Sequence, residues 1–285
     1  MIPAPSINNK NTLMREFFGL SKLSENGYGF LREAEGAWSW QHLSFVFSLL
    51  VLMTFLAIWL GMRNKHRSDK QKNKVLIVCA FLINGFELLK IVILCIRCQD
   101  ALHWLYVLPL FLCSIQLIAI PLAAFCKGRV KEASLDFVFL FGILGAVFGT
   151  IGAAQNYSAY PTLSMDNVFS GITHTISGFA SIYIGVSGMM SMKKKNIPIV
   201  IGLIVAISVL AYTVNVLIDY NYMFLMYHDG TPYSIVYNLV NGNRVLYPLL
   251  VVALFIVYIG LFDSVYYLIQ NKLQTKKAVS TETEQ

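Results

Sequence analysis

Apolar residues gather in seven long stretches along the chain, and short polar segments separate them. A helix needs about 20 mostly apolar residues to cross the hydrocarbon layer of a bilayer, and each stretch has roughly that length. The sequence therefore predicts an all-α fold, a polytopic bundle of seven transmembrane helices. The predicted spans cover residues 43–62, 74–97, 104–126, 135–154, 168–190, 197–219 and 245–268.

The composition supports a membrane location. Apolar residues make up 56% of the 285 residues and charged residues only 13%, against about 25% charged residues in ordinary soluble domains. We expect an external N-terminal tail with an interfacial segment at 1–42, one membrane domain at 43–269, and a disordered cytoplasmic tail at 270–285. The expected location is the cell membrane, with membrane lipids as partners.

The distribution of Lys and Arg predicts the orientation of the spans. The connections after the first, third and fifth spans and the C-terminal tail together hold fifteen of these residues, whereas the other connections between spans hold only Arg97 and Arg244. Cytoplasmic loops carry the excess of basic residues, so we predict an external N-terminus and a cytoplasmic C-terminus. The same clusters account for the formal net charge of +7, and we expect no nucleic-acid partner.

The second predicted span carries Asn84, Glu87 and Lys90 at steps of three. Ionisable residues inside a span are costly, so they usually face other helices or a wet cavity. Glu87 and Lys90 are close enough on a helix to pair. They are therefore either an ion pair that fixes helix packing or part of a functional site.

The third and fifth predicted spans carry a cysteine and a histidine. Cys113 lies between Pro109 and Gln116 at spacings of four and three, which puts all three on one helical face. His174 lies in a run of glycines that recur every seven residues, where another helix can approach closely, so it faces protein rather than lipid. Cys113 is either a small core residue or a nucleophile. His174 either bonds a neighbouring helix or acts as a base.

The remaining spans add further polar and small residues. In the sixth span, Asn215, Asp219 and Tyr222 share one helical face. In the fourth span, glycines at 142, 145, 149 and 152 are typical of close helix packing, and we assign them no chemical role. Cys95 and Cys98 are separated by two residues, but no second such pair completes a metal site, so we expect neither metal nor cofactor.

The depths of the polar residues predict one common pocket. At a helical rise of about 1.5 Å per residue, Cys113, Glu87 and His174 all fall in the outer half of the bilayer. Asn215 and Asp219 lie near the same rim. The sequence therefore predicts a single outward-facing polar pocket.

Four segments carry a family resemblance: LPLFLC at 108–113, GILGAVFGTIGAAQNYSAYP at 142–161, SGITH at 170–174 and DYNYMFL at 219–225. In this order and spacing they resemble the YwaF-like family of bacterial integral membrane proteins. That family is similar to a eukaryotic transmembrane family of cysteine-dependent phospholipid acyltransferases. The resemblance implies that Cys113, which ends LPLFLC, holds an acyl group as a thioester. It also implies that His174, which ends SGITH, is the general base.

The residues are compatible with that chemistry. A thiol among apolar side chains is inert until a neighbouring imidazole takes its proton. Gln116 or Asn215 could hold the resulting thiolate, and Glu87 or Asp219 could orient the ring. The predicted function is a lipid acyltransferase or acyl hydrolase. The alternatives are an ion- or proton-coupled transporter of small solutes, and a non-enzymatic membrane sensor or assembly protein.

Overall fold

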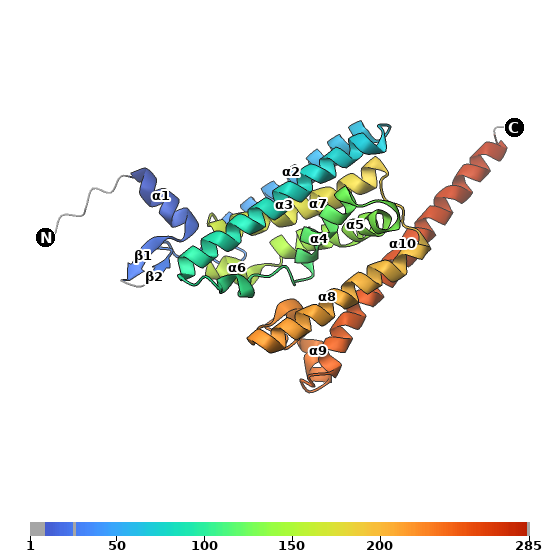
Figure 1. The fold of residues 1–285 in the computed structure, drawn as a ribbon. Helices are drawn as coiled ribbons and strands as arrows, with labels where there is room; N and C mark the ends of the chain where they lie inside the picture. Colours follow the sequence, from blue (N-terminus) through green and yellow to red (C-terminus); the bar gives the residue numbers. More distant parts are fainter. Residues whose placement is uncertain (1–8, 25–26, 284–285) are drawn as a thin grey trace. The chain divides into compact units, whose positions relative to one another are not determined.

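The computed structural model describes residues 9–24 and 27–283, and nearly all the secondary structure in them is helical (Figure 1). The chain divides into two compact units, Met1–Ser191 and Met192–Gln285.

The first unit begins with a small folded segment. Helix α1 (Asn9–Phe18) precedes a hairpin of strands β1 (Ser21–Ser24) and β2 (Gly27–Gly29), in which Ser21 pairs with Gly29. Among the described residues this hairpin is the exception to the predicted all-α fold. Its two strands are only four and three residues long.

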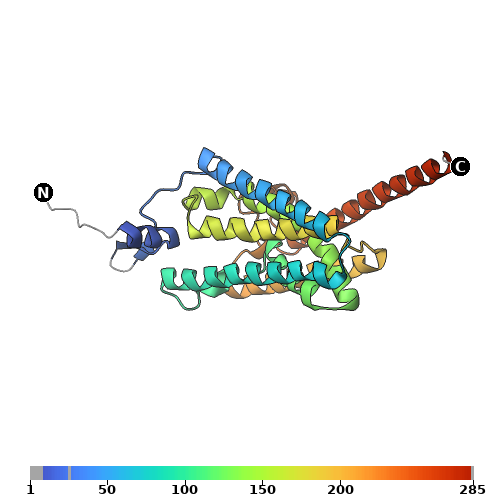
Figure 2. The same ribbon diagram turned by 90° about the horizontal axis from the view of Figure 1, so that it is seen from above.

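Four long helices form the rest of the first unit: α2 (Trp40–Asn64), α3 (Asp69–Cys98), α5 (Gly128–Thr150) and α7 (Met165–Ser187). Helix α7 lies between α2 and α3 (Figure 2), and it also packs along α5. It is therefore covered by protein on several sides. This explains why α7 carries more Ser, Thr and Asn than its neighbours.

Glycines let α7 and α5 approach closely, as the sequence predicted. A β-carbon added at Gly142 of α5 would lie 2.5 Å from the Ser177 carbonyl oxygen of α7. One added at Gly178 would lie 2.6 Å from the β-carbon of Ala146 and would also overlap Met53 of α2. Both distances are shorter than van der Waals contact, so larger residues at these positions would push the helices apart.

The predicted third span, 104–126, is not one continuous helix. It consists of a 3₁₀ turn η1 (His103–Tyr106), an irregular stretch, a second 3₁₀ turn η2 (Cys113–Ile115) and helix α4 (Gln116–Phe125). Pro109 lies in the irregular stretch. Because proline lacks an N–H and disfavours helical geometry in the residue before it, the first half of the predicted span leaves the helical path. Pro109 therefore does not share a helical face with Cys113 and Gln116, and that expectation was wrong.

Five helices in the described residues are long and apolar enough to cross a membrane. They are Trp40–Asn64, Asp69–Cys98, Gly128–Ala159, Lys194–Ile218 and Leu246–Lys272; the third of these runs from α5 into the short helix α6 (Ala154–Ala159). The other two predicted spans coincide with α7 and with a shorter apolar segment, Cys113–Phe125. The chain is thus a multi-pass membrane protein.

The second unit contains a 3₁₀ turn η3 (Lys194–Asn196), α8 (Ile197–Ile218), a 3₁₀ turn η4 (Tyr222–Phe224), α9 (Ser234–Leu239) and α10 (Leu246–Thr283). Helix α8 packs against α10. The sequence-based boundaries at residues 42/43 and 269/270, and the disorder expected after residue 269, stay predictions.

Candidate functional site

Cys113 and His174 both lie against α5, at positions one turn apart. A β-carbon added at Gly145 would lie 3.8 Å from the β-carbon of Cys113, which is ordinary contact distance. One added at Gly149, one turn further along, would overlap the ring of His174. Two glycines four residues apart therefore form a shallow cradle on α5 that receives the cysteine from η2 and the histidine from α7.

The imidazole of His174 is oriented by the same cradle. A ring nitrogen of His174 faces the backbone carbonyl of Gly145, one turn before Gly149. An N–H on that nitrogen leaves the other ring nitrogen with a free lone pair. A neutral imidazole in this state can accept a proton from a thiol.

The side chain of Cys113 lies at a break in the backbone. Its residue opens η2 directly after the irregular stretch, and it is half-buried. This partial exposure differs from the state of a cysteine packed inside a helix, such as Cys79, which is 4% exposed.

Glu87 and Lys90 pair as the sequence allowed. The Lys90 Nζ lies 2.6 Å from one carboxylate oxygen of Glu87 and 2.7 Å from the other, and both side chains are mostly buried. Lys90 is also close enough to Cys113 and His174 to interact with both electrostatically. The ion pair therefore borders the Cys113–His174 cradle. Asn84 has a structural role, because its amide donates to the carbonyls of Ala80 and Leu117 and ties α3 to α4.

Gln116 is the unusual polar residue of the site. It begins α4, one turn after Cys113, and it is fully buried. Neither its Nε2 nor its Oε1 has a hydrogen-bond partner among the described residues.

Asn215, Asp219 and Tyr222 belong to the second unit, where local structure accounts for them. The Asn215 amide donates to the Tyr222 carbonyl at 3.0 Å and accepts from the Tyr222 N–H at 2.7 Å. Asp219 ends α8 in a left-handed conformation, with φ of 52°. These contacts shape the turn after α8. The role that the sequence predicted for the three residues in the site stays a prediction.

A cysteine and a histidine are in contact at another place in the first unit. The Cys98 sulfur lies 3.5 Å from Nε2 of His103, just beyond the end of α3, and this pair is exposed. It has no glycine cradle, so it offers a useful comparison with Cys113 and His174.

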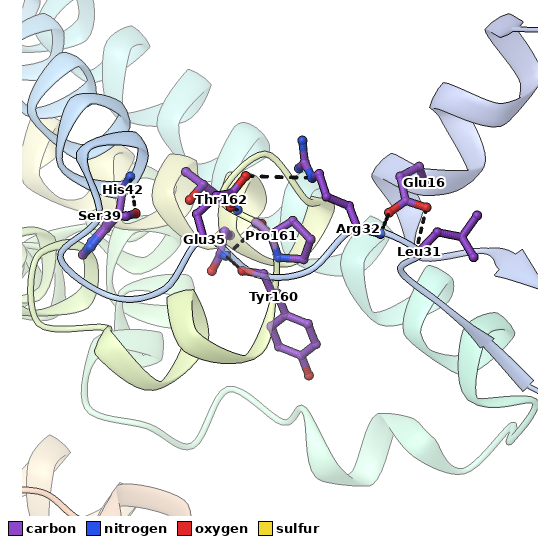
Figure 3. A network of polar contacts seen from close by, with 10 residues as sticks. Glu16, Leu31, Arg32, Glu35, Ser39, His42, Tyr160, Pro161 and Thr162 are labelled. Atoms are coloured by element: carbon purple, nitrogen blue, oxygen red, sulfur yellow. Dashed lines mark hydrogen bonds and ion pairs between the residues drawn. The ribbon is translucent and has the colours of Figure 1, made fainter. Parts of the chain in front are cut away.

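The N-terminal segment is fastened to the end of the bundle where α7 begins (Figure 3). Glu16 accepts hydrogen bonds from the backbone N–H groups of Leu31 and Arg32. Glu35 accepts one from the backbone N–H of Thr162, in the loop before α7. Partial burial alone would raise the pKa of both carboxyls, but these bonds hold the pKa of Glu16 and of Glu35 below the ordinary value of 4.5.

An ion pair at the same end of the bundle joins α3 to α7 and contacts the N-terminal segment through Phe30. Arg97 of α3 makes two hydrogen bonds of 2.7 Å to the carboxylate of Asp166 in α7, and its guanidinium lies over the rings of Phe30 and Tyr160. Phe17 of α1 packs nearby against the apolar cluster around Phe169.

From the sequence we identified the cysteine, the histidine and the ion pair as candidates for a functional site, but not Gly145 and Gly149. We interpreted all four glycines of α5 as helix-packing positions, and a packing glycine and a cradle glycine look alike in a sequence. The available signal was their spacing of four residues, which puts both on one face of α5.

The model of the TMEM164 family matches residues 37–266, a range that includes every residue of the cradle. No curated protein and no solved structure matches the chain.

Proposed function

The chain belongs to the TMEM164 family, and we propose that it is a membrane-embedded, cysteine-dependent acyltransferase or acyl hydrolase that acts on phospholipids. The observation that carries this proposal is the convergence of Cys113 and His174 on one glycine cradle of α5. A nucleophile and a base from different elements are thus brought to neighbouring turns of one helix, and covalent acyl transfer requires such a pair within reach of each other.

In the proposed reaction His174 takes the proton of the Cys113 thiol, and the sulfur attacks the carbonyl carbon of a phospholipid ester. The C–S bond forms and the C–O bond to the glycerol oxygen breaks. The imidazolium returns the proton to the leaving oxygen, which releases a lysophospholipid and leaves an acyl thioester on Cys113. An acceptor hydroxyl, from a lysophospholipid or from water, then gives its proton to His174 and attacks the thioester. The sulfur leaves and recovers that proton from the ring.

An ion pair lies at the edge of the cradle. The ammonium of Lys90 is close enough to Cys113 and His174 to interact with both electrostatically. The charge of Lys90 is balanced by Glu87, so the pair places no net charge in the apolar layer, where a single charge would be costly. That balance also argues against the alternative of an ion or proton path, because the two charged groups already neutralise each other.

The proposed topology has seven spans in the cell membrane, an external N-terminus and a cytoplasmic C-terminus. Two basic connections of the first unit meet at one end of the bundle, where Asn73 bonds both the Ala124 carbonyl and Lys131. Under the positive-inside rule that end is cytoplasmic. Lys90 lies much closer to the other end of α3, at Cys98, than to Asp69, which supports a site in the outer leaflet.

The test is the capture of an acyl group on the protein. Purified wild type, Cys113→Ser and His174→Ala are incubated with a phospholipid that carries a labelled acyl chain. Cys126→Ser is the matched control, because Cys126 is also partly buried and lies at the other end of α4. We expect hydroxylamine-sensitive label on wild type and Cys126→Ser, none on Cys113→Ser, and little on His174→Ala.

Label on Cys113→Ser at the wild-type level would overturn the proposal. Absence of label from all four proteins, across phospholipids of different head groups and chains, would also overturn it. In that case, flux assays on Glu87 and His174 variants would test the transport alternative.

A further inference from the structure

A fully buried amide without a hydrogen-bond partner needs an explanation. Gln116 is 0% exposed, and both polar atoms of its side chain are unpartnered among the residues that the structure describes. Burying an amide in this way costs free energy unless something bonds to it. The expected partner is a group that is present only when substrate is bound or is reacting.

The position of Gln116 places it next to the candidate nucleophile. Cys113 opens the 3₁₀ turn η2, and Gln116 follows three residues later. In a 3₁₀ helix, side chains three residues apart are eclipsed. Gln116 therefore lies directly above Cys113 on the same side of the chain, about 6 Å further along at the 3₁₀ rise of about 2.0 Å per residue.

Its surroundings hold this part of the backbone in place. Asn84 of α3 donates to the carbonyl of Leu117, the residue after Gln116, and anchors the first turn of α4. The same face of α3 carries Glu87 and Lys90 one and two turns further on. The Gln116 side chain is thus fixed at its base while its amide stays unbonded.

The backbone amides of the two residues after Cys113 are occupied. In many acyl-transfer enzymes, N–H groups beside the nucleophile stabilise the oxyanion of the tetrahedral intermediate. In this chain the N–H groups of Ser114 and Ile115 both donate to the Phe111 carbonyl, at 2.9 and 3.2 Å. These two amides are therefore not free for an oxyanion, whereas Gln116 has two N–H donors on one nitrogen.

We propose that the Gln116 amide is the oxyanion donor of the acyl-transfer site. As Cys113 attacks the ester, the carbonyl oxygen gains negative charge and accepts a hydrogen bond from Nε2 of Gln116. The charge is stabilised during attack and collapse, and no proton moves to or from the amide. This role rests on the proposed acyl transfer.

The test compares two reactions of the same sulfur. Acylation by a phospholipid passes through an oxyanion, whereas alkylation by iodoacetamide displaces iodide and forms none. The variant is Gln116→Met, which keeps the length of the side chain and removes its donor. Gln71→Met is the control, because Gln71 is an exposed glutamine in α3. Both rates are measured at Cys113 on full-length protein in detergent or vesicles.

For Gln116→Met we expect acylation to slow by about 10²- to 10³-fold, the usual effect of removing one oxyanion donor. We expect its alkylation to stay close to the wild-type rate, and Gln71→Met to behave as wild type in both reactions. An equal fall in both rates would mean that Gln116 only positions Cys113. Unchanged acylation would mean that Gln116 neither stabilises the oxyanion nor positions Cys113. Either result overturns this role while leaving the thioester intact. If wild type is alkylated but never acylated, the proposed function itself fails.

Discussion

Gly149 lies directly against the imidazole of His174, so closely that a β-carbon at position 149 would overlap the ring. The histidine ring can occupy this place only because α5 carries no side chain there. This relationship gives the first prediction.

We predict that Gly149→Ala displaces the His174 ring and lowers Cys113 acylation by about 10²-fold, which is the usual effect of a shift of about 1 Å in a reacting group. Gly85→Ala is the control, because a β-carbon at Gly85 of α3 meets no described atom within 4 Å. Alanine is favoured over glycine inside a helix by roughly 0.5–1 kcal/mol, so the control should be active and slightly more stable. Equal activity of the two variants would argue against the cradle.

The ion pair at Glu87 and Lys90 gives a stability prediction. Glu87→Gln leaves the ammonium of Lys90 mostly buried without its partner, which we expect to destabilise the protein by about 3 kcal/mol, the lower end for breaking a buried pair. The double variant Glu87→Gln/Lys90→Met removes both charges and should recover most of that loss. Unfolding in mixed micelles measures both. If the double variant is as unstable as the single variant, the pair has no such role.

The attachment of the N-terminal segment should depend on pH. Glu16 and Glu35 have a pKa below the ordinary value of 4.5 in the folded protein. Their stabilising effect is therefore complete above about pH 4.5 and is lost as the pH falls through their folded-state pKa. Hydrogen exchange of the Arg32 and Thr162 amides, corrected for the intrinsic rate, should accelerate below pH 4.5.

The matched variants separate this effect from general acid unfolding. Glu16→Gln should weaken the protection of Arg32 already at pH 7, whereas Glu33→Gln, at an exposed position, should not. Equal protection of Arg32 and Thr162 at pH 6 and pH 3 would contradict the assignment.

The sequence predicted most of the long helices because a span of about 20 apolar residues has few alternatives in a bilayer. The third span shows the limit of that reasoning. Hydropathy is nearly the same in a helix and in an irregular apolar stretch, and Pro109 identifies a break without showing how far it extends. Irregular backbone is tolerated there because the stretch is at least half-buried against other protein segments.

The candidate site was predictable in its residue types but not in its geometry. Polar residues inside apolar spans identify Glu87, Cys113 and His174 as candidates. That Gly145 and Gly149 receive Cys113 and His174 depends on how three elements pack, and so does the buried, unbonded state of Gln116. No local pattern contains that information. The folded N-terminal segment was likewise missed, because its few apolar anchors, such as Phe17, lie in an otherwise polar stretch.

The most direct test of the account is to find which cysteine carries the acyl group. Wild-type protein is incubated with a phospholipid of defined acyl chains and digested, and every cysteine-containing peptide is examined by mass spectrometry before and after hydroxylamine. We predict one acyl group, on Cys113, that hydroxylamine removes. An acyl group on Cys98, the exposed cysteine beside His103, or on no cysteine would contradict it.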